Sequence, residues 1–149
     1  MKPSEVRSRV LSDHERLRRD LDRLGDLAGV IRNGHVALAT LRADTEVLLA
    51  RLEAHMHWEE SYLLPALREA DAWGVERAEQ LTRDHREQRE LLDYLTRSLR
   101  DRAKPAALFE REVRHLIGLL RDDMREEEAE LLDERVLRDD VVAVVALTS

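Results

Sequence analysis

Six residues of metal-ligand type recur along this sequence in two matched sets. Each set begins with a single histidine and continues, roughly forty positions later, with two ligand-type residues spaced four apart. Residues four apart lie on one face of an α-helix, one turn from each other. Imidazole and carboxylate ligands together suit iron, manganese or zinc. The two sets are His14, His55 and Glu59, followed by His85, Asp123 and Glu127.

Four segments with the apolar periodicity of helices carry these residues. They are predicted at roughly 4–28, 38–66, 78–99 and 109–131. Glycine-rich or proline-containing stretches at 29–34, 71–74 and 104–105 favour turns between them. Pro65 is expected to kink or end the second segment, because its ring removes a backbone donor and clashes with the preceding turn.

The first and third segments resemble each other, and so do the second and fourth. The stretch DHERLRRDL at 13–21 is similar to DHREQRELL at 84–92, and HMHWEESYLL at 55–64 is similar to DMREEEAELL at 123–132. One helical hairpin used twice, with short loops, predicts an all-α fold, an antiparallel up-down four-helix bundle. We assign residues 1–136 to this bundle and residues 137–149 to a C-terminal tail or a short extra helix.

The ligand-type residues interrupt the inward apolar rows of the predicted helices. His14, for example, falls in the row of Val10 and Leu17. The middle levels of an antiparallel bundle meet at its axis, so three imidazoles and three carboxylates are expected to converge there. A carboxylate taken out of water costs several kcal/mol unless it is compensated, and a whole domain is stable by only roughly 5–15 kcal/mol. Two divalent cations, ~3.5–4 Å apart in sites of this kind, with one bridging hydroxide would leave the site close to neutral.

The sequence has a histidine followed by HxxxE, and then a second histidine followed by [HD]xxxE. This pattern resembles that of the hemerythrin-like family of HHE cation-binding domains. HMHWEE at 55–60 with LPAL at 64–67 is similar to that family's second-helix motif, and DHR at 84–86 to the start of its third helix. The resemblance covers about residues 10–132. It implies a hemerythrin-like bundle with a di-iron centre. The implied terminal ligands are His14, His55, His85 and Asp123, and the implied bridging ligands are Glu59 and Glu127.

The sequence departs from the family pattern at two positions. Asp123 stands where a fourth-helix histidine is expected, and Arg89 stands where oxygen-carrying hemerythrins have an additional histidine. A site richer in carboxylate should hold ferric iron more tightly and lower its reduction potential. These departures therefore disfavour reversible oxygen carriage.

The predicted function is that of a non-haem protein with two iron ions bridged by an oxo or hydroxo group. It is expected to bind, sense or react with oxygen, peroxide or nitric oxide. Manganese and zinc stay open as metals. Two alternatives also stay open: a di-iron enzyme of peroxidase or catalase type, and a degenerate bundle that acts as an interaction module.

Composition argues against several other classes of protein. The formal net charge of −7 leaves no basic surplus for nucleic acid, and no stretch approaches the ~18 apolar residues of a membrane span. The sequence has no cysteine, which excludes disulfides and thiolate sites, and its first residues lack the apolar core of a signal peptide. We expect a cytoplasmic protein without nucleic-acid or membrane partners, and a homodimer stays open.

Overall fold

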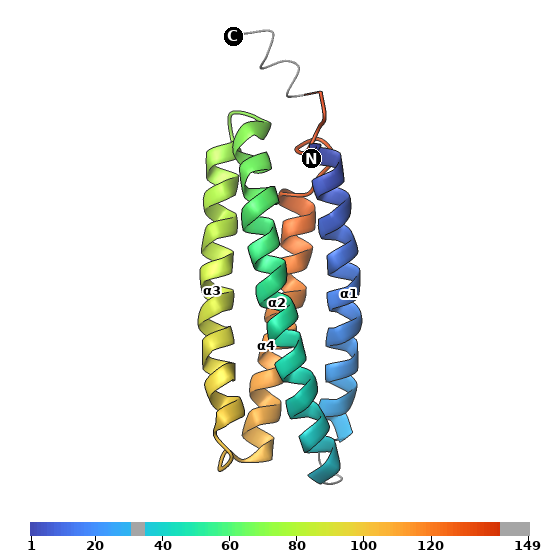
Figure 1. Cartoon of the computed structure of the whole chain (residues 1–149), viewed down its shortest axis with the longest axis vertical. Coiled ribbons are helices and arrows are strands. Elements are labelled where there is room, and N and C mark those ends of the chain that lie inside the picture. Colours follow the sequence, from blue (N-terminus) through green and yellow to red (C-terminus); the bar gives the residue numbers. More distant parts are fainter. Residues whose placement is uncertain (31–34, 141–149) are drawn as a thin grey trace.

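The chain folds into four long antiparallel helices. The computed structural model describes residues 1–30 and 35–140. Its helices are α1 (Pro3–Val30), α2 (His35–Ala70), α3 (Gly74–Arg100) and α4 (Ala106–Glu130). Each runs opposite to the one before it, so the bundle is of the up-down type (Figure 1). The described residues contain no strand, and the predicted all-α four-helix bundle is confirmed.

The interior of the bundle contains two apolar clusters, one toward each end. The lower cluster lies toward the α1–α2 and α3–α4 connections and is built around Leu21, Leu52, Leu95 and Phe109. The upper cluster is centred on residues such as Val10, Leu67, Leu81 and Leu131. Burial of these side chains supplies the main stabilisation of the bundle, at roughly 1.5–3 kcal/mol for each large one.

Helix α2 differs from the prediction, because it continues five residues beyond Pro65 to Ala70. Pro65 and Ser61 are both exposed, so the carbonyl of Ser61, which loses its helical partner, can bind water instead. Leu67 and Ala70 are buried in the upper cluster and hold the last turn in place. Tertiary packing therefore outweighs the local effect of the proline.

A three-residue turn joins α2 to α3, and Gly74 begins α3 directly against the end of α2. The backbone N–H of Trp73 donates to the Asp71 carboxylate at 2.8 Å, and that of Gly74 to the Asp71 carbonyl at 3.1 Å. A Cβ atom at position 74 would lie 2.3 Å from the carbonyl oxygen of Leu67. Only glycine fits this close approach of two backbones.

Residues 131–140 turn back over the upper end of the bundle. Leu132 and Leu137 are buried in the upper cluster, and the hydroxyl of Ser4 donates to the Asp139 carboxylate at 2.7 Å. The division of the chain at residue 136 stays a prediction. The predicted tail or short helix falls largely on residues 141–149, outside the described residues. Within the described part, no helix has an apolar stretch long enough to cross a bilayer.

Replacing Gly74 by alanine is expected to destabilise the protein by about 1–3 kcal/mol, because the new methyl group would overlap backbone atoms that cannot move independently. The melting temperature should fall by about 3–10 °C. Gly118→Ala is the matched control. Gly118 lies exposed within α4 with nothing near its Cβ position, so alanine there should stabilise the helix by about 0.5–1 kcal/mol. Equal melting temperatures for the two variants would contradict this account of the turn.

Candidate metal centre

A layer of ionisable side chains separates the two apolar clusters. We call it the polar layer, and all of its members are at most 9% exposed. On α1 it lies between Val10 and Leu17, and on α3 between Leu81 and Leu92. The polar layer consists of His14, His55, Glu59, His85 and Glu127.

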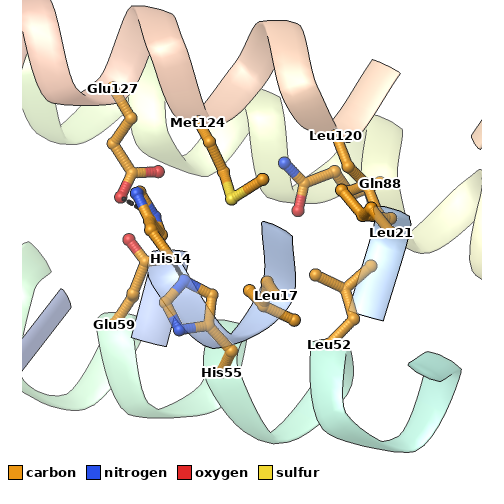
Figure 2. A pocket seen from close by; sticks show the side chains of 10 residues that line it. All are labelled: His14, Leu17, Leu21, Leu52, His55, Glu59, Gln88, Leu120, Met124 and Glu127. Carbon is orange, nitrogen blue, oxygen red and sulfur yellow. Dashed lines mark ion pairs between the residues drawn. The ribbon is translucent and has the colours of Figure 1, made fainter. Parts of the chain in front are cut away.

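Four members of the polar layer form a compact group at the bundle axis. Ligand atoms of His14, His55, Glu59 and Glu127 all lie within 4.8 Å of one another. Figure 2 shows these side chains pointing toward one another from α1, α2 and α4. His55 Nε2 lies 2.5 Å from Glu59 Oε1, and His14 Nε2 lies 3.4 Å from Glu127 Oε1. Such a set of nitrogen and oxygen atoms matches the ligand types of an iron, manganese or zinc site.

The other two predicted ligands lie in different positions relative to this group. His85 adjoins it, with its Nε2 atom 3.7 Å from Glu59 Oε1. Glu59 Oε1 therefore lies between the imidazoles of His55 and His85. Asp123 is partly buried and outside the compact group, and its Oδ2 accepts a hydrogen bond from Gln88 Nε2 at 2.9 Å.

Several polar atoms of the layer lack a hydrogen-bond partner within the protein. They include Glu59 Oε2, Glu127 Oε1 and both ring nitrogens of His85. Elsewhere in the described residues, the buried side-chain atoms without a hydrogen bond are one oxygen of Glu112 and Asp44 Oδ2, which forms an ion pair with Arg23 at 2.9 Å. An unsatisfied buried polar group costs about 1–3 kcal/mol, and a charged one more. The chemistry of these donor atoms fits a bound cation, which would satisfy carboxylate and imidazole lone pairs together.

Each layer histidine turns Nε2 inward and Nδ1 outward toward a carboxylate. His55 Nδ1 is 3.3 Å from Asp13 Oδ2, and His14 Nδ1 is 3.6 Å from Glu128 Oε2. His85 Nδ1 is likewise 3.6 Å from Glu60 Oε2. In metal sites, a carboxylate on the outer nitrogen commonly fixes the orientation of a ligating imidazole and increases its basicity.

An arginine pairs with each of two outer glutamates from the surface side. Arg18 donates to both carboxylate oxygens of Glu128, at 2.8 and 2.5 Å. Arg89 makes the same two-pronged contact with Glu60. Both arginines follow a layer histidine by one helical turn, because Arg18 follows His14 as Arg89 follows His85.

Helical phase places Glu60 and Glu128 at the solvated face or just outside the ligands, but it does not identify their arginine partners, although the internal repeat contains them. Both repeats have a histidine followed four positions later by arginine, and both have a Glu-Glu pair. The family pattern marks Arg89 only as the replacement of a histidine, whereas its position in the repeat corresponds to that of Arg18. The repeated spacing could have identified two equivalent Arg–Glu–His chains.

The two glutamates of the compact group have opposite pKa shifts. Burial raises the pKa of Glu127 well above its ordinary value, and the negative charge of Glu59 raises it further. Burial would also raise the pKa of Glu59, but the contact with His55 and the neighbouring imidazole of His85 outweigh it, and the pKa is lowered. Without a metal, a proton bound by this pair is therefore held by Glu127 rather than by Glu59.

The pKa values of His14 and His55 also shift in opposite directions, through burial and hydrogen bonding. Burial lowers the pKa of His14 to about 4, so this imidazole is neutral. Burial also acts to lower the pKa of His55, but hydrogen bonding to Glu59 and Asp13 outweighs it and the pKa is raised. A neutral imidazole is the form that binds metal. His14 is already in that form, while His55 must release a proton when its pKa exceeds the ambient pH.

The two halves of the repeat differ at one corner of the layer. In the first half Asp13 faces the imidazole of His55, whereas in the second half Asp84 has Asp123 near it. Burial, followed by the charge of Asp123, raises the pKa of Asp84 to about 6. Gln88 donates to Asp123 and occupies the position that corresponds to Leu17. The Asp123 replacement is thus accompanied by a polar partner on the neighbouring helix.

The remaining histidines with described side chains lie outside the layer. His57 and His115 are exposed, as the helical phase of His57 predicts. Tyr62, which follows Glu59 by one turn, is 45% exposed and packs on the ring of Trp58 rather than in the layer.

Comparison with known proteins identifies the family of this chain. The model of the hemerythrin HHE cation binding domain matches residues 6–134. No match was found among curated proteins or among solved structures. The matched range includes nearly all of α1, the whole of α2, α3 and α4, and every residue of the polar layer. The resemblance inferred from the sequence is confirmed, and the chain belongs to the hemerythrin HHE cation-binding domain family.

Proposed function

We propose that the polar layer binds two iron ions and that the loaded protein binds, senses or reacts with a small oxidant or diatomic ligand. The observation that carries this proposal is the convergence of three imidazoles and two carboxylates in a buried layer with unsatisfied polar atoms. Membership of a cation-binding family supports the metal. The mixed nitrogen and oxygen donors favour iron, with manganese or zinc as competing ions.

The positions of the side chains suggest how two ions would be shared. Glu59 is the proposed bridging ligand, because its Oε1 atom lies between His55 and His85. Glu127 is the second proposed bridge, and it contacts His14 from the neighbouring helix α4. Asp123 becomes a terminal ligand only if one of its carboxylate oxygens turns toward the compact group, because it lies outside that group and its Oδ2 accepts from Gln88. It is therefore the proposed ligand with the least direct support.

The space beside the compact group restricts the size of any reacting molecule. An interior cavity there offers only about 10 Å³ to a water-sized molecule. Leu17, Leu21, Leu52, Leu120 and Met124 line its far side (Figure 2). Such a space is close to the minimum for a single water, so it favours a ligand of very few atoms over any larger substrate.

The protein's own residues would orient the ligands and exclude water. Glu128 and Glu60, held by Arg18 and Arg89, lie 3.6 Å from the outer nitrogens of His14 and His85 and would fix the orientation of these imidazoles. The leucines of the cavity keep bulk water from the centre. When bound, the iron pair would supply the exchange of electrons with the small ligand and an open coordination position.

Iron loading tests the proposed function, with His55→Ala as the disruptive variant. Full-length protein loaded with ferrous iron without oxygen should retain about two ions per chain by elemental analysis. Oxygen or peroxide should then produce near-ultraviolet charge-transfer bands, and His55→Ala should lose most of the iron and the bands. His57→Ala is the matched control, because it removes an exposed imidazole from the same helix two positions away.

Two outcomes would contradict the proposal. One is less than one retained iron per chain together with a melting temperature that added iron does not change, since a ligand bound to the native state must stabilise it. The other is equal loss of iron in both histidine variants. Repeated turnover of peroxide by the loaded protein would assign it to the enzymes, whereas a single stoichiometric change would assign it to sensors or binding proteins.

Replacing Glu127 by glutamine should have opposite effects on the stability of the metal-free protein and of the iron-loaded protein. The raised pKa of Glu127 means that the folded metal-free chain holds a proton that the unfolded chain releases. The stability that protonated Glu127 contributes to the metal-free fold is fully present below an ordinary carboxyl pKa of about 4.3 and is lost as pH rises toward the raised pKa. Glutamine does not ionise, so metal-free Glu127→Gln should be more stable than wild type at pH 8, by about 1–2 kcal/mol.

The same variant should lose the stabilisation that iron gives to the wild type. Denaturant unfolding at several pH values, with and without iron, measures both effects. Glu130→Gln is the control, because Glu130 is exposed one turn farther along the chain. A metal-free Glu127→Gln protein less stable than wild type at pH 8 would show that the carboxylate stabilises the fold by itself.

A further inference from the structure

A groove on the outer surface runs between α1 and α2, next to the metal centre but outside it. It has a volume of about 590 Å³, and the two helices that form it pack side by side (Figure 1). Leu17 and His55 line both this groove and the interior cavity, so they separate the two spaces. The charged residues of the groove are Arg9, Arg16, Arg19, Arg51, Asp13 and Asp20.

The charge of the groove is opposite to that of the whole chain. Four guanidinium groups face two carboxylates there, whereas the chain has a formal net charge of −7. Helix surfaces with mixed charges are common and usually need no ligand. This surface differs because it is concave and because its lining has two more guanidinium groups than carboxylates. Arg19 in particular has no ion-pair partner among the described residues.

Most of the guanidinium donors in the groove remain free to bind a ligand. Arg9 contacts Asp13 through Nε alone, and Arg16 contacts the same oxygen through one terminal nitrogen. Arg51 uses a single terminal nitrogen for both oxygens of Asp20. A guanidinium has five N–H donors in a planar fork, so each of these arginines keeps further donors available.

Aromatic packing and ion pairs hold the walls of the groove in place. The Arg9 guanidinium lies over the Trp58 ring at 5.1 Å, and Trp58 packs on Tyr62 with ring centroids 4.8 Å apart. Asp13 at the floor is occupied by Arg9, Arg16 and His55 together. It therefore has little capacity left to neutralise the remaining arginine charge.

We propose that this groove binds a tetrahedral oxyanion of the phosphate class, either free phosphate or the phosphate group of a small phosphomonoester. Planar guanidinium forks match the oxygen spacing of phosphate, and each can donate two parallel hydrogen bonds. The surplus of two positive charges matches a dianion rather than a single carboxylate. This site adjoins the proposed iron centre across Leu17 and His55, but its anion-binding groups are the arginines and it does not require iron.

Isothermal titration of the full-length protein at low salt tests this site, with inorganic phosphate and glycerol 3-phosphate as the two probes. Tighter binding of one probe identifies the source of the phosphate group. Arg19→Gln removes the arginine without an ion-pair partner and should weaken binding about tenfold. The double variant Arg19→Gln/Arg51→Gln should weaken it further, and added salt should weaken binding to the wild type.

Arg97→Gln is the matched control, because Arg97 is exposed near the end of α3, outside the groove, and loses the same charge. Circular dichroism melting of each variant confirms that it is folded. Absence of binding of both probes to wild type would overturn the proposal, and so would equal weakening by the control. Phosphate binding that survives Arg19→Gln but disappears when iron is removed would place the anion on the metal and would also overturn it.

Discussion

The fold depends on how five ionisable side chains are tolerated in the dry middle of a small bundle. His14, Glu59 and their neighbours lie between two apolar clusters, where water cannot compensate their charges. Each uncompensated charge costs several kcal/mol, which is a large part of a domain's total stability of roughly 5–15 kcal/mol. Without a cation the pKa values of the two carboxylates shift in opposite directions, because the pKa of Glu59 is lowered while burial and the charge of Glu59 raise the pKa of Glu127. A bound cation removes the need for that compromise, since it favours both carboxylates in their ionised form.

The carboxylates outside the polar layer and those inside it are compensated in different ways. From outside, arginines neutralise the glutamates that face His14 and His85, so the outer ring nitrogens meet oriented carboxylates. On the inside, no lysine or arginine of the described residues contacts Glu59 or Glu127. Among these residues the inner carboxylates therefore have no lysine or arginine to compensate them, and a bound cation would fill that role. The approximate two-fold repeat explains why this arrangement occurs twice, and the Asp123 position is where the two copies differ.

Much of this architecture could be predicted from the sequence, because helical periodicity and the repeat are strong local patterns. The four helices, their order and the inward position of His14, His55 and Glu127 follow from spacing alone. The end of α2 could not be predicted, since burial of Leu67 and Ala70 overrides the local effect of Pro65. The contact of Gln88 with Asp123 depends on how α3 and α4 face each other, which spacing along one helix does not determine. The groove between α1 and α2 likewise arises only when two charged helix faces are placed together.

Anomalous diffraction from crystals of the iron-loaded protein tests most directly whether a metal pair occupies the polar layer. Data collected on both sides of the iron absorption edge should show two peaks ~3.5–4 Å apart. Both peaks should lie between Glu59 and Glu127, one on the His14 side and one on the His85 side. Iron peaks at the surface alone, with Glu59 and Glu127 still ordered around an interior free of metal, would contradict the account.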